Sequence, residues 1–339
     1  MQISVIGLDI AKQVFQVHAA DAAGRTVAQI KLRRAQVLDY FQALPPCLVG
    51  LEACATAHYW ARELSALGHS VRLMPPAYVK PYVRRNKTDA ADAQAIAEAL
   101  TRPTMRFVPV KSADQQAMLM LHRARELLVR QRTMLATALR AHLAEFGIIA
   151  PQGIQRVEKL AAQLHDPSVP PLARDALNLL VEQLASTWKQ IDTIEMQLVA
   201  IHRTQAVSRR LASIPGVGPI TAMAIASTVS DPTMFRSGRE FAAWLGLIPK
   251  SHSSGGKDRL GRISKRGDRY IGHLLYVGAG NVIRFAKARA VAGENWIRGL
   301  QQRRPPKVVI IALANKMARI AWALMVREQP FRSPAQAAP

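Results

Sequence analysis

Two short apolar runs early in the chain each end at a carboxylate, and this pattern constrains the fold more than any other. Residues 3–8 (Ile-Ser-Val-Ile-Gly-Leu) end at Asp9, and residues 47–51 (Cys-Leu-Val-Gly-Leu) end at Glu52. Short apolar runs of this length are typical of buried strands. The sequence therefore predicts two buried strands, each of which places an acidic side chain at its carboxyl end.

Further strands and helices are predicted around these two runs. Residues 14–18 and 26–32 alternate between apolar and polar side chains and flank the turn Asp21-Ala22-Ala23-Gly24, so they extend the first strand into an antiparallel meander. The remaining patterns indicate helices at 35–44 and 57–67, a strand at 70–74 and a break at Pro75-Pro76. Residues 1–111 are therefore expected to form an α/β domain.

A third acidic motif follows in the stretch Lys87-Thr88-Asp89-Ala90-Ala91-Asp92. Thr88 suits a helix N-cap and the alanine-rich run after it suits a helix, so Asp89 and Asp92, three positions apart, share one helical face. Such a pair can bind a divalent metal, although acids in a first helical turn also simply complement the helix dipole.

The other two acids favour the metal interpretation. Mg²⁺ prefers oxygen ligands, and two such ions roughly 4 Å apart can stabilise both the attacking and the leaving oxygen of a phosphodiester. We therefore predict a site for Mg²⁺, with Mn²⁺ as an alternative, at four residues: Asp9, Glu52, Asp89 and Asp92. The order of elements resembles the ribonuclease-H-like (RuvC-type) fold, in which these four acids fall where its metal ligands lie.

The net charge of +23 is distributed unevenly along the chain. It is +6 over residues 1–111, zero over 112–202 and +17 over 203–339. A strongly basic final third suits a phosphate backbone, and such binding weakens steeply with salt. The neutral middle carries apolar residues at helical spacing over 116–146 and 172–202, which predicts long paired helices of coiled-coil type that hold two protomers together.

Cysteine content and hydropathy bear on location. The two cysteines, Cys47 and Cys54, are too few for a disulfide framework, and no secretory leader opens the sequence. The apolar run 308–326 is interrupted by Asn315, Lys316 and Arg319, so we expect a buried amphipathic helix and no membrane role. A cytoplasmic protein is predicted.

Within the basic final third, residues 203–327 are expected to form a C-terminal domain, and it contains two motifs suited to nucleic acid. Ile214-Pro215-Gly216-Val217-Gly218-Pro219 resembles a helix-hairpin-helix turn, in which Gly216 and Gly218 would let backbone amides approach a phosphate, or is simply a tight turn between helices. A capping box at Ser237 then opens a short helix over 241–245. Helices are also expected at 270–286 and 307–326, and residues 328–339 are expected to be a loose tail.

The second motif is the segment 250–268, which is rich in Ser, Gly and cations and has few apolar residues. It is either a flexible basic surface loop or a phosphate-handling loop in which a serine hydroxyl attacks phosphorus. The phosphate-binding cations predicted here and in the acidic motif are Lys87, Lys250, Lys257, Arg259, Arg262, Lys265 and Arg266.

Several motifs together resemble one family. They are Gly-Leu-Asp9-Ile-Ala-Lys12, Leu-Glu52-Ala, Lys87-Thr-Asp89-Ala-Ala-Asp92-Ala, Ile214-Pro-Gly-Val-Gly-Pro, Phe241-Ala-Ala-Trp-Leu-Gly-Leu-Ile-Pro249 and Ser253-Ser-Gly-Gly-Lys-Asp-Arg-Leu-Gly-Arg-Ile-Ser-Lys265. In this order they resemble the DEDD transposases of the insertion sequence 110 family, in its 1111 subgroup. The resemblance runs from about residue 3 to residue 326.

The resemblance implies an RNA-guided DNA recombinase that works as a dimer or tetramer. In that family a metal domain and a C-terminal domain with a nucleophilic serine form one composite site, and a bridge RNA pairs with donor and target DNA. By motif, the acids map onto Asp9, Glu52, Asp89 and Asp92, and the serine onto Ser254, with Ser253 as the rival. Attack would leave a 5′-phosphoserine link and a free 3′-hydroxyl. The alternatives are a metal nuclease that uses water as nucleophile and a non-catalytic nucleic-acid-binding protein.

Overall fold

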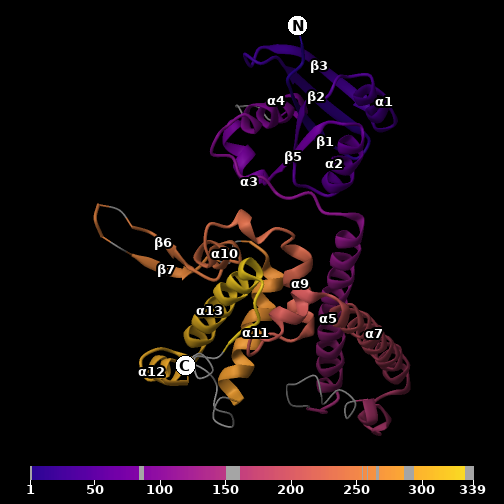
Figure 1. The fold of residues 1–339 in the computed structure, drawn as a ribbon. Coiled ribbons are helices and arrows are strands. Elements are labelled where there is room, and N and C mark those ends of the chain that lie inside the picture. Colours follow the sequence, from indigo (N-terminus) through magenta and orange to yellow (C-terminus); the bar gives the residue numbers. More distant parts are fainter. Residues whose placement is uncertain are drawn as a thin grey trace. The chain divides into compact units, whose positions relative to one another are not determined.

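The chain forms two units, residues 1–116 and residues 117–339 (Figure 1). The structure is a computed structural model that describes residues 2–83, 88–149, 161–253, 255–257, 259–264, 267–285 and 294–332. Unit 1 holds a sheet with helices, and unit 2 is mainly helical. The predicted fold class, an α/β region followed by a largely helical remainder, is confirmed.

Unit 1 is built on a five-stranded sheet of order β3-β2-β1-β4-β5. Its strands are β1 (Val5–Ile10), β2 (Val14–Ala20), β3 (Thr26–Arg33), β4 (Leu48–Glu52) and β5 (Ser70–Met74). The first three pair antiparallel, as the predicted meander does, and β4 and β5 join parallel to β1. The helices are α1 (Val37–Gln42), α2 (Ala57–Ala66), α3 (Pro76–Val79) and α4 (Asp89–Leu100).

The two faces of this sheet are covered by different helices. On one face of β1, Ile6 and Leu8 are fully buried in a cluster that includes Trp60 of α2. On the other face, Val5 packs against a cluster that includes Ile96 of α4. Because successive side chains of a strand point to opposite faces, Asp9 belongs to the same side as Val5, which is the side of α4.

Unit 2 combines two long helices with a bundle of shorter ones. The long pair is α5 (Ala113–Ala144), which begins at the end of unit 1, and α7 (Pro171–Thr204). Leu139 of α5 and Leu184 of α7 share one apolar cluster, and Arg125 of α5 donates to Glu195 of α7 at 2.7 Å. The others are α8 (Ala206–Leu211), α9 (Pro219–Thr228), α10 (Gly238–Trp244), α11 (Arg269–Phe285), α12 (Glu294–Gln301) and α13 (Pro306–Arg327).

Helix α13 is the central element of that bundle. It packs against α10 and α11 and buries Val309, Leu313 and Met317 in the main apolar cluster of the unit. Within the described part of the chain it is the one helix long and apolar enough to cross a membrane, and 44% of its most apolar window is buried inside the unit. Asn315, which interrupts the apolar run, donates its side-chain N–H to the Leu247 carbonyl at 3.1 Å.

Several boundaries differ from those expected from the sequence. The helix expected at 35–44 is shortened to α1 because residues Arg34–Gln36 form a 3₁₀ turn. The segment 250–268 contains a small hairpin of β6 (Pro249–Ser251) and β7 (Leu260–Ile263), which the sequence pattern did not predict. The start of the expected loose tail contacts unit 2, since the Phe331 N–H donates to Ser213 Oγ at 2.9 Å. Residues 333–339 lie outside the described residues.

Candidate functional site

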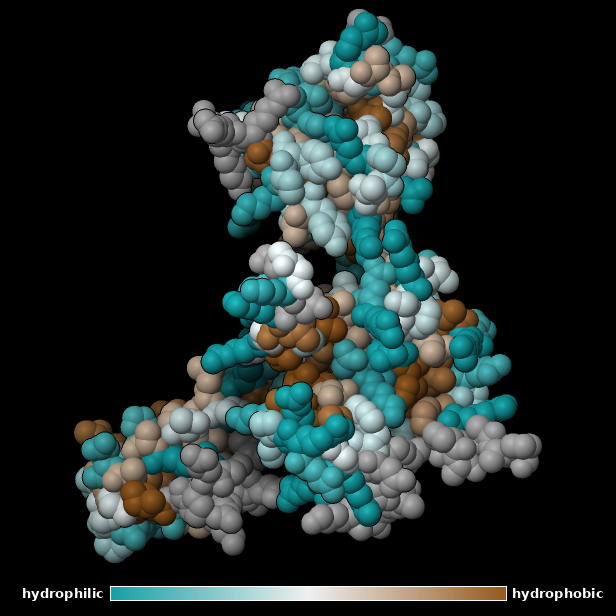
Figure 2. All heavy atoms as spheres, turned by 90° about the vertical axis from the view of Figure 1, so that its left-hand side faces the viewer, coloured by the Kyte–Doolittle hydropathy of each residue, from teal (hydrophilic) through white to brown (hydrophobic). Residues whose placement is uncertain are grey.

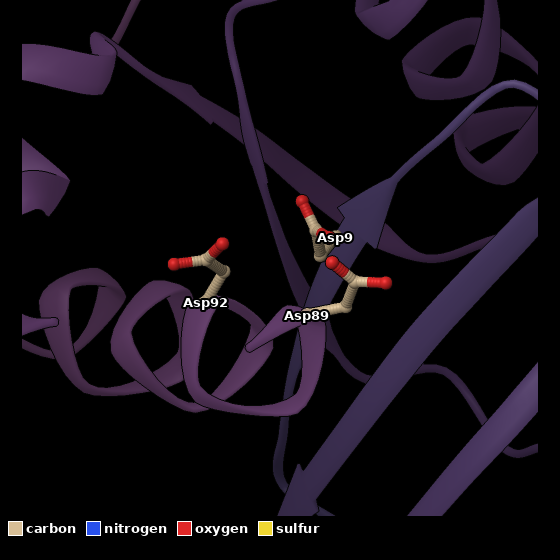
Figure 3. Close-up of side chains that lie close together, drawn as sticks. All are labelled: Asp9, Asp89 and Asp92. Carbon is tan, nitrogen blue, oxygen red and sulfur yellow. The ribbon is translucent and has the colours of Figure 1, made fainter. Parts of the chain in front are cut away.

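Three of the four predicted acids lie together in unit 1. One carboxylate oxygen of each of Asp9, Asp89 and Asp92 lies within 4.8 Å of the others. Asp9 and Asp92 are half-buried and Asp89 is exposed. Figure 3 shows Asp9 on β1 facing the side of α4 that carries Asp89 and Asp92. Residues about eighty positions apart in sequence therefore form one acidic cluster.

The start of helix α4 is fixed by a side-chain cap. Thr88 is its N-cap, and the Thr88 Oγ1 accepts a hydrogen bond from the Ala91 N–H at 3.2 Å. This cap satisfies one of the amides that a helix N-terminus leaves without a partner. It also fixes where the helix begins, so that Asp89 and Asp92 both fall in the first turn, as predicted.

Two glycines let α4 approach the sheet closely enough for this cluster. Gly7 of β1 and Gly50 of β4 are paired directly in the sheet. A Cβ on Gly7 would overlap the Ala93 carbonyl oxygen and the Ala97 backbone of α4, and a Cβ on Gly50 would lie 2.8 Å from Leu100 Cδ2. Each glycine stands two residues before an acid, on the same face of its strand. This glycine pair was not predicted from the sequence, although the repeated Gly-Leu-acid spacing was a usable signal.

Glu52, the fourth acid, ends the strand next to that of Asp9. Leu8 pairs with Leu51 at the end of the parallel β1–β4 ladder, so Asp9 and Glu52 each follow the last residue that these two strands pair with each other. The charges of both acids reach the thiol of Cys54. Burial raises the pKa of Cys54, and the negative charges of Glu52 and Asp9 raise that pKa further. Glu52 is therefore close to the acidic cluster, and Cys54 lies beside it, which the sequence analysis did not anticipate.

The donor set and spacing fit a hard divalent cation. All four side chains offer carboxylate oxygens, which are the ligands that Mg²⁺ prefers. Two ligands on opposite sides of one Mg²⁺ are about 4.2 Å apart, so oxygens within 4.8 Å of one another reach a shared ion by small side-chain rotations. Asp9, Asp89 and Asp92 would hold the ion, with Glu52 beside them.

The β6–β7 hairpin of unit 2 carries the candidate serine region. The Ser253 hydroxyl lies 2.9 Å from Ser251 Oγ and accepts a hydrogen bond from the Arg259 N–H at 3.3 Å. The His252 N–H donates to the Arg259 carbonyl at 2.8 Å, and Gly255 and Gly256 have φ of 56° and 74°, which suits a tight turn. The described cations of the hairpin, Lys250, Lys257, Arg259 and Arg262, are all exposed.

The remaining predicted residues are distributed as follows. Ser254, Lys265, Arg266 and Lys87 lie outside the described residues. Gly216 has φ of 86°, and a Cβ there would lie 2.8 Å from the Gly278 carbonyl oxygen of α11, so this glycine serves close packing between segments. Gly218 is exposed at the N-cap of α9, and none of the described residues beyond its chain neighbours lies within 4 Å of where its Cβ would stand.

Comparison with known proteins gives the class. A family model described as Transposase IS116/IS110/IS902 family matches residues 208–292, and a DEDD transposase model of the IS110 type matches residues 6–148. The first covers the hairpin with α9, α10 and α11, and the second covers the acidic cluster. Both describe transposases, so the class is that of enzymes that move DNA segments.

Relatives along the whole chain give the family. A probable family 20 transposase of Pseudomonas aeruginosa is 50% identical, covering 98% of this chain and 99% of its own length. The transposases of IS1328 from Yersinia enterocolitica and IS1111A from Coxiella burnetii are each 38% identical, covering 97% of this chain and 98% and 92% of their own lengths. The chain belongs to the IS116/IS110/IS902 family of transposases, and the likeness to the IS1111A protein fits the 1111 subgroup.

Proposed function

We propose that this transposase is a serine recombinase that excises and inserts its element by metal-assisted strand exchange. Membership of a transposase family carries the general activity and DNA as the substrate. The observation that supports the metal-assisted step is the cluster of Asp9, Asp89 and Asp92 beside the ends of two parallel strands. A RuvC-type identity of unit 1 is part of the proposal, supported by its strand order and by the position of α4.

Each group in this chain has a defined task in the proposed reaction. A divalent cation held by the acids would neutralise charge on the scissile phosphate. The serine Oγ attacks phosphorus, so that an Oγ–P bond forms and the P–O3′ bond breaks. The serine hydroxyl gives up its proton as the bond forms, the leaving 3′-oxygen takes up a proton, and the 5′-phosphate stays linked to serine. Cations of the hairpin, Lys257 and Arg259 among them, would stabilise the charge on the phosphate oxygens.

The proposed nucleophile is Ser254, with Ser253 as its rival. The Ser253 hydroxyl accepts the Arg259 N–H and lies against Ser251 Oγ, so it holds the two arms of the hairpin together. A hydroxyl that serves this structural purpose is less free to attack. This bonding supports Ser254, the next residue in the chain.

A covalent intermediate tests the proposal. The protein is incubated with a labelled donor site, the RNA of its element and Mg²⁺, and the products are separated by denaturing electrophoresis. Protein shifted by attached DNA is expected in the wild type and in Ser253→Ala, and it should be missing in Ser254→Ala. If the adduct is lost in Ser253→Ala alone, Ser253 is the nucleophile and Ser254 is not. Cleavage without an adduct, with a 5′-phosphate made from water, would support the metal nuclease instead.

Two partners complete the proposal. Following the family resemblance, we propose that a structured RNA encoded by the element guides the enzyme. One discrete RNA should then co-purify when the protein is expressed with its flanking DNA, and co-purification of random cellular RNA would contradict this.

We also propose that the protein acts in the bacterial cytoplasm.

The second partner is another copy of the chain, bound through the long helices of unit 2. Large apolar side chains are exposed along both: Met120 at 70% and Met134 at 69% on α5, and Leu179 at 68% and Met196 at 66% on α7. Exposed apolar side chains in a region whose net charge over residues 112–202 is zero favour contact with a second protomer. Light scattering of nucleic-acid-free protein should report a dimer, and a monomer mass at all concentrations would count against it.

A further inference from the structure

Unit 2 contains a groove whose residues, apart from the hairpin cation Arg262, have no part in the proposed chemistry. Its volume is about 1600 Å³, above the roughly 300–1,000 Å³ of small-molecule pockets, so it has room for an extended ligand. Helices α10, α11, α12 and α13 and the β6–β7 hairpin contribute its walls. Figure 2, which faces the side where the hairpin lies in Figure 1, shows brown hydrophobic surface enclosed by teal hydrophilic side chains in this unit.

The charged side chains that the structure describes along the groove all have the same sign. Five cations line it: Arg239, Arg262, Lys307, Lys316 and Arg319. No Asp or Glu is among the described lining residues, and within the described part of the chain none of the five forms an ion pair. Burying a basic surface against a partner requires opposite charge. The groove therefore suits a polyanion and disfavours an apolar or basic peptide.

Apolar and aromatic side chains also line the groove, and we call this part of the lining its floor. Tyr276, Trp296 and Trp322 line it together with aliphatic side chains of α13, among them Val308, which is 49% exposed. Trp296 is 40% exposed and Lys316 Nζ lies 4.8 Å from its ring centroid. The Trp322 ring is fixed by the hydrogen bond from its Nε1–H to the Pro232 carbonyl at 3.0 Å. Aromatic rings fixed next to cations are the arrangement on which unpaired bases stack while their phosphates are neutralised.

We propose that this groove binds a single, unpaired DNA strand. In a duplex the bases are already stacked inside, so a duplex would use the cations and leave the aromatic floor uncovered. The groove continues into the hairpin, because Pro249 of β6 and Gly261 and Ile263 of β7 also line it. A strand held there would lead to or from the serine region. The choice of DNA over RNA rests on the proposed function, in which the hairpin acts on DNA.

Binding of a labelled oligonucleotide tests this without any cleavage. Anisotropy of a fluorescein-labelled oligo-dT of about 12 nucleotides is measured in EDTA, with a duplex of equal length and oligo-U as competitors. Trp296→Ala should weaken binding by about 5- to 150-fold, the usual effect of removing one stacking ring. Trp296→Phe should restore most of the affinity, because the ring is kept.

Charge variants separate groove binding from general attraction. Lys307→Glu should weaken binding. The plot of log affinity against log salt should also become shallower, by about 0.7 in slope for each phosphate that the groove no longer neutralises. The matched control is Lys189→Glu, the same charge change on an exposed position of α7 outside the groove. Melting temperatures of all variants check that unit 2 stays folded.

Three results would overturn the inference. They are unchanged affinity in Trp296→Ala, equal weakening in Lys307→Glu and Lys189→Glu, and competition by duplex as strong as by single strand. Tighter binding of oligo-U than of oligo-dT would overturn the assignment to DNA. Because the assay contains no metal, failure of the serine adduct leaves it unaffected. A wild-type protein that binds oligo-dT but forms no adduct would refute the proposed serine chemistry, and the inference that the groove binds a single strand would stand.

Discussion

The acidic cluster of unit 1 and the serine hairpin of unit 2 are built in opposite ways. Asp9 stands on β1, which is buried by α2 on one face and by α4 on the other, and Asp89 and Asp92 stand on α4, which packs against the sheet. The hairpin has two short strands with no buried residue, and its described cations are all exposed. The acidic cluster therefore stands on elements of a packed core, whereas the serine hairpin lies outside the core of its unit.

This difference predicts how changes in each region act. A metal site demands that several oxygens be held within a few tenths of an ångström, which rigid strands and helices supply. A segment that grips phosphates can be exposed, because long cationic side chains adapt to their partner. In unit 1, activity and stability should therefore change together around α4, and in the hairpin they should change separately.

The largest expected effect comes from the acid on β1. Asp9→Asn keeps the shape of the side chain and removes its charge, so the cleavage rate should fall by about a thousandfold or more, the effect of losing several kcal/mol of charge stabilisation. DNA binding should persist, because residues 203–339 carry most of the positive charge. Cleavage of a labelled donor site in Mg²⁺ measures this.

The control for this change is Asp39→Asn, which alters an exposed acid on α1 outside the cluster. It should cleave as the wild type does. Full activity of Asp9→Asn, or of the wild type in EDTA, would remove the metal site and with it one side of the comparison.

The next effect couples stability to activity. In Gly7→Ala the new methyl group overlaps the Ala93 carbonyl and the Ala97 backbone, so α4 must move off the sheet. Overpacking of this kind costs about 1–3 kcal/mol and should lower the melting temperature by several degrees. Because α4 carries Asp89 and Asp92, cleavage should fall as well, even at temperatures where the variant is folded.

Gly299→Ala is the matched control, since within the described part of the chain no atom outside its own helix and chain neighbours lies within 4 Å of the position of its Cβ. It lies within α12, where alanine is a better helix former than glycine. Its melting temperature, measured by calorimetry, and its cleavage rate should both be close to those of the wild type. A Gly7→Ala protein as stable and as active as the wild type would show that α4 does not need its close approach to β1.

The sequence predicted those parts of unit 1 that depend on local pattern. Apolar runs ending in Asp9 and Glu52, and the cap at Thr88, follow from periodicity and helix-end chemistry, and the meander and the two later strands were found where expected. The approach of α4 to the sheet could not be read in the same way. It depends on glycines in two strands that become neighbours only after β1 and β4 pair.

Unit 2 was harder to predict from its sequence. The hairpin strands have no buried face, so the alternation that marks a half-buried strand is missing, and the segment was predicted as a loop. The groove combines residues of four helices and the hairpin, some eighty positions apart in sequence. The long helices α5 and α7 were predicted because an apolar stripe sustained over 32 and 34 residues is a strong signal.

The smallest expected effect tests the other side of the comparison. Lys257→Ala removes one exposed cation from the hairpin, so DNA affinity should fall modestly and the log–log salt slope should decrease by about 0.9 for one duplex phosphate that is no longer neutralised. The melting temperature should stay unchanged, because surface substitutions away from packed features are usually within about 0.5 kcal/mol of neutral. Affinity measured over a salt series, with calorimetry beside it, separates the two quantities. A fall of several degrees without a change in slope would mean that Lys257 supports the fold and not the nucleic acid, and the contrast between a core-built site and a projecting one would then fail at the hairpin.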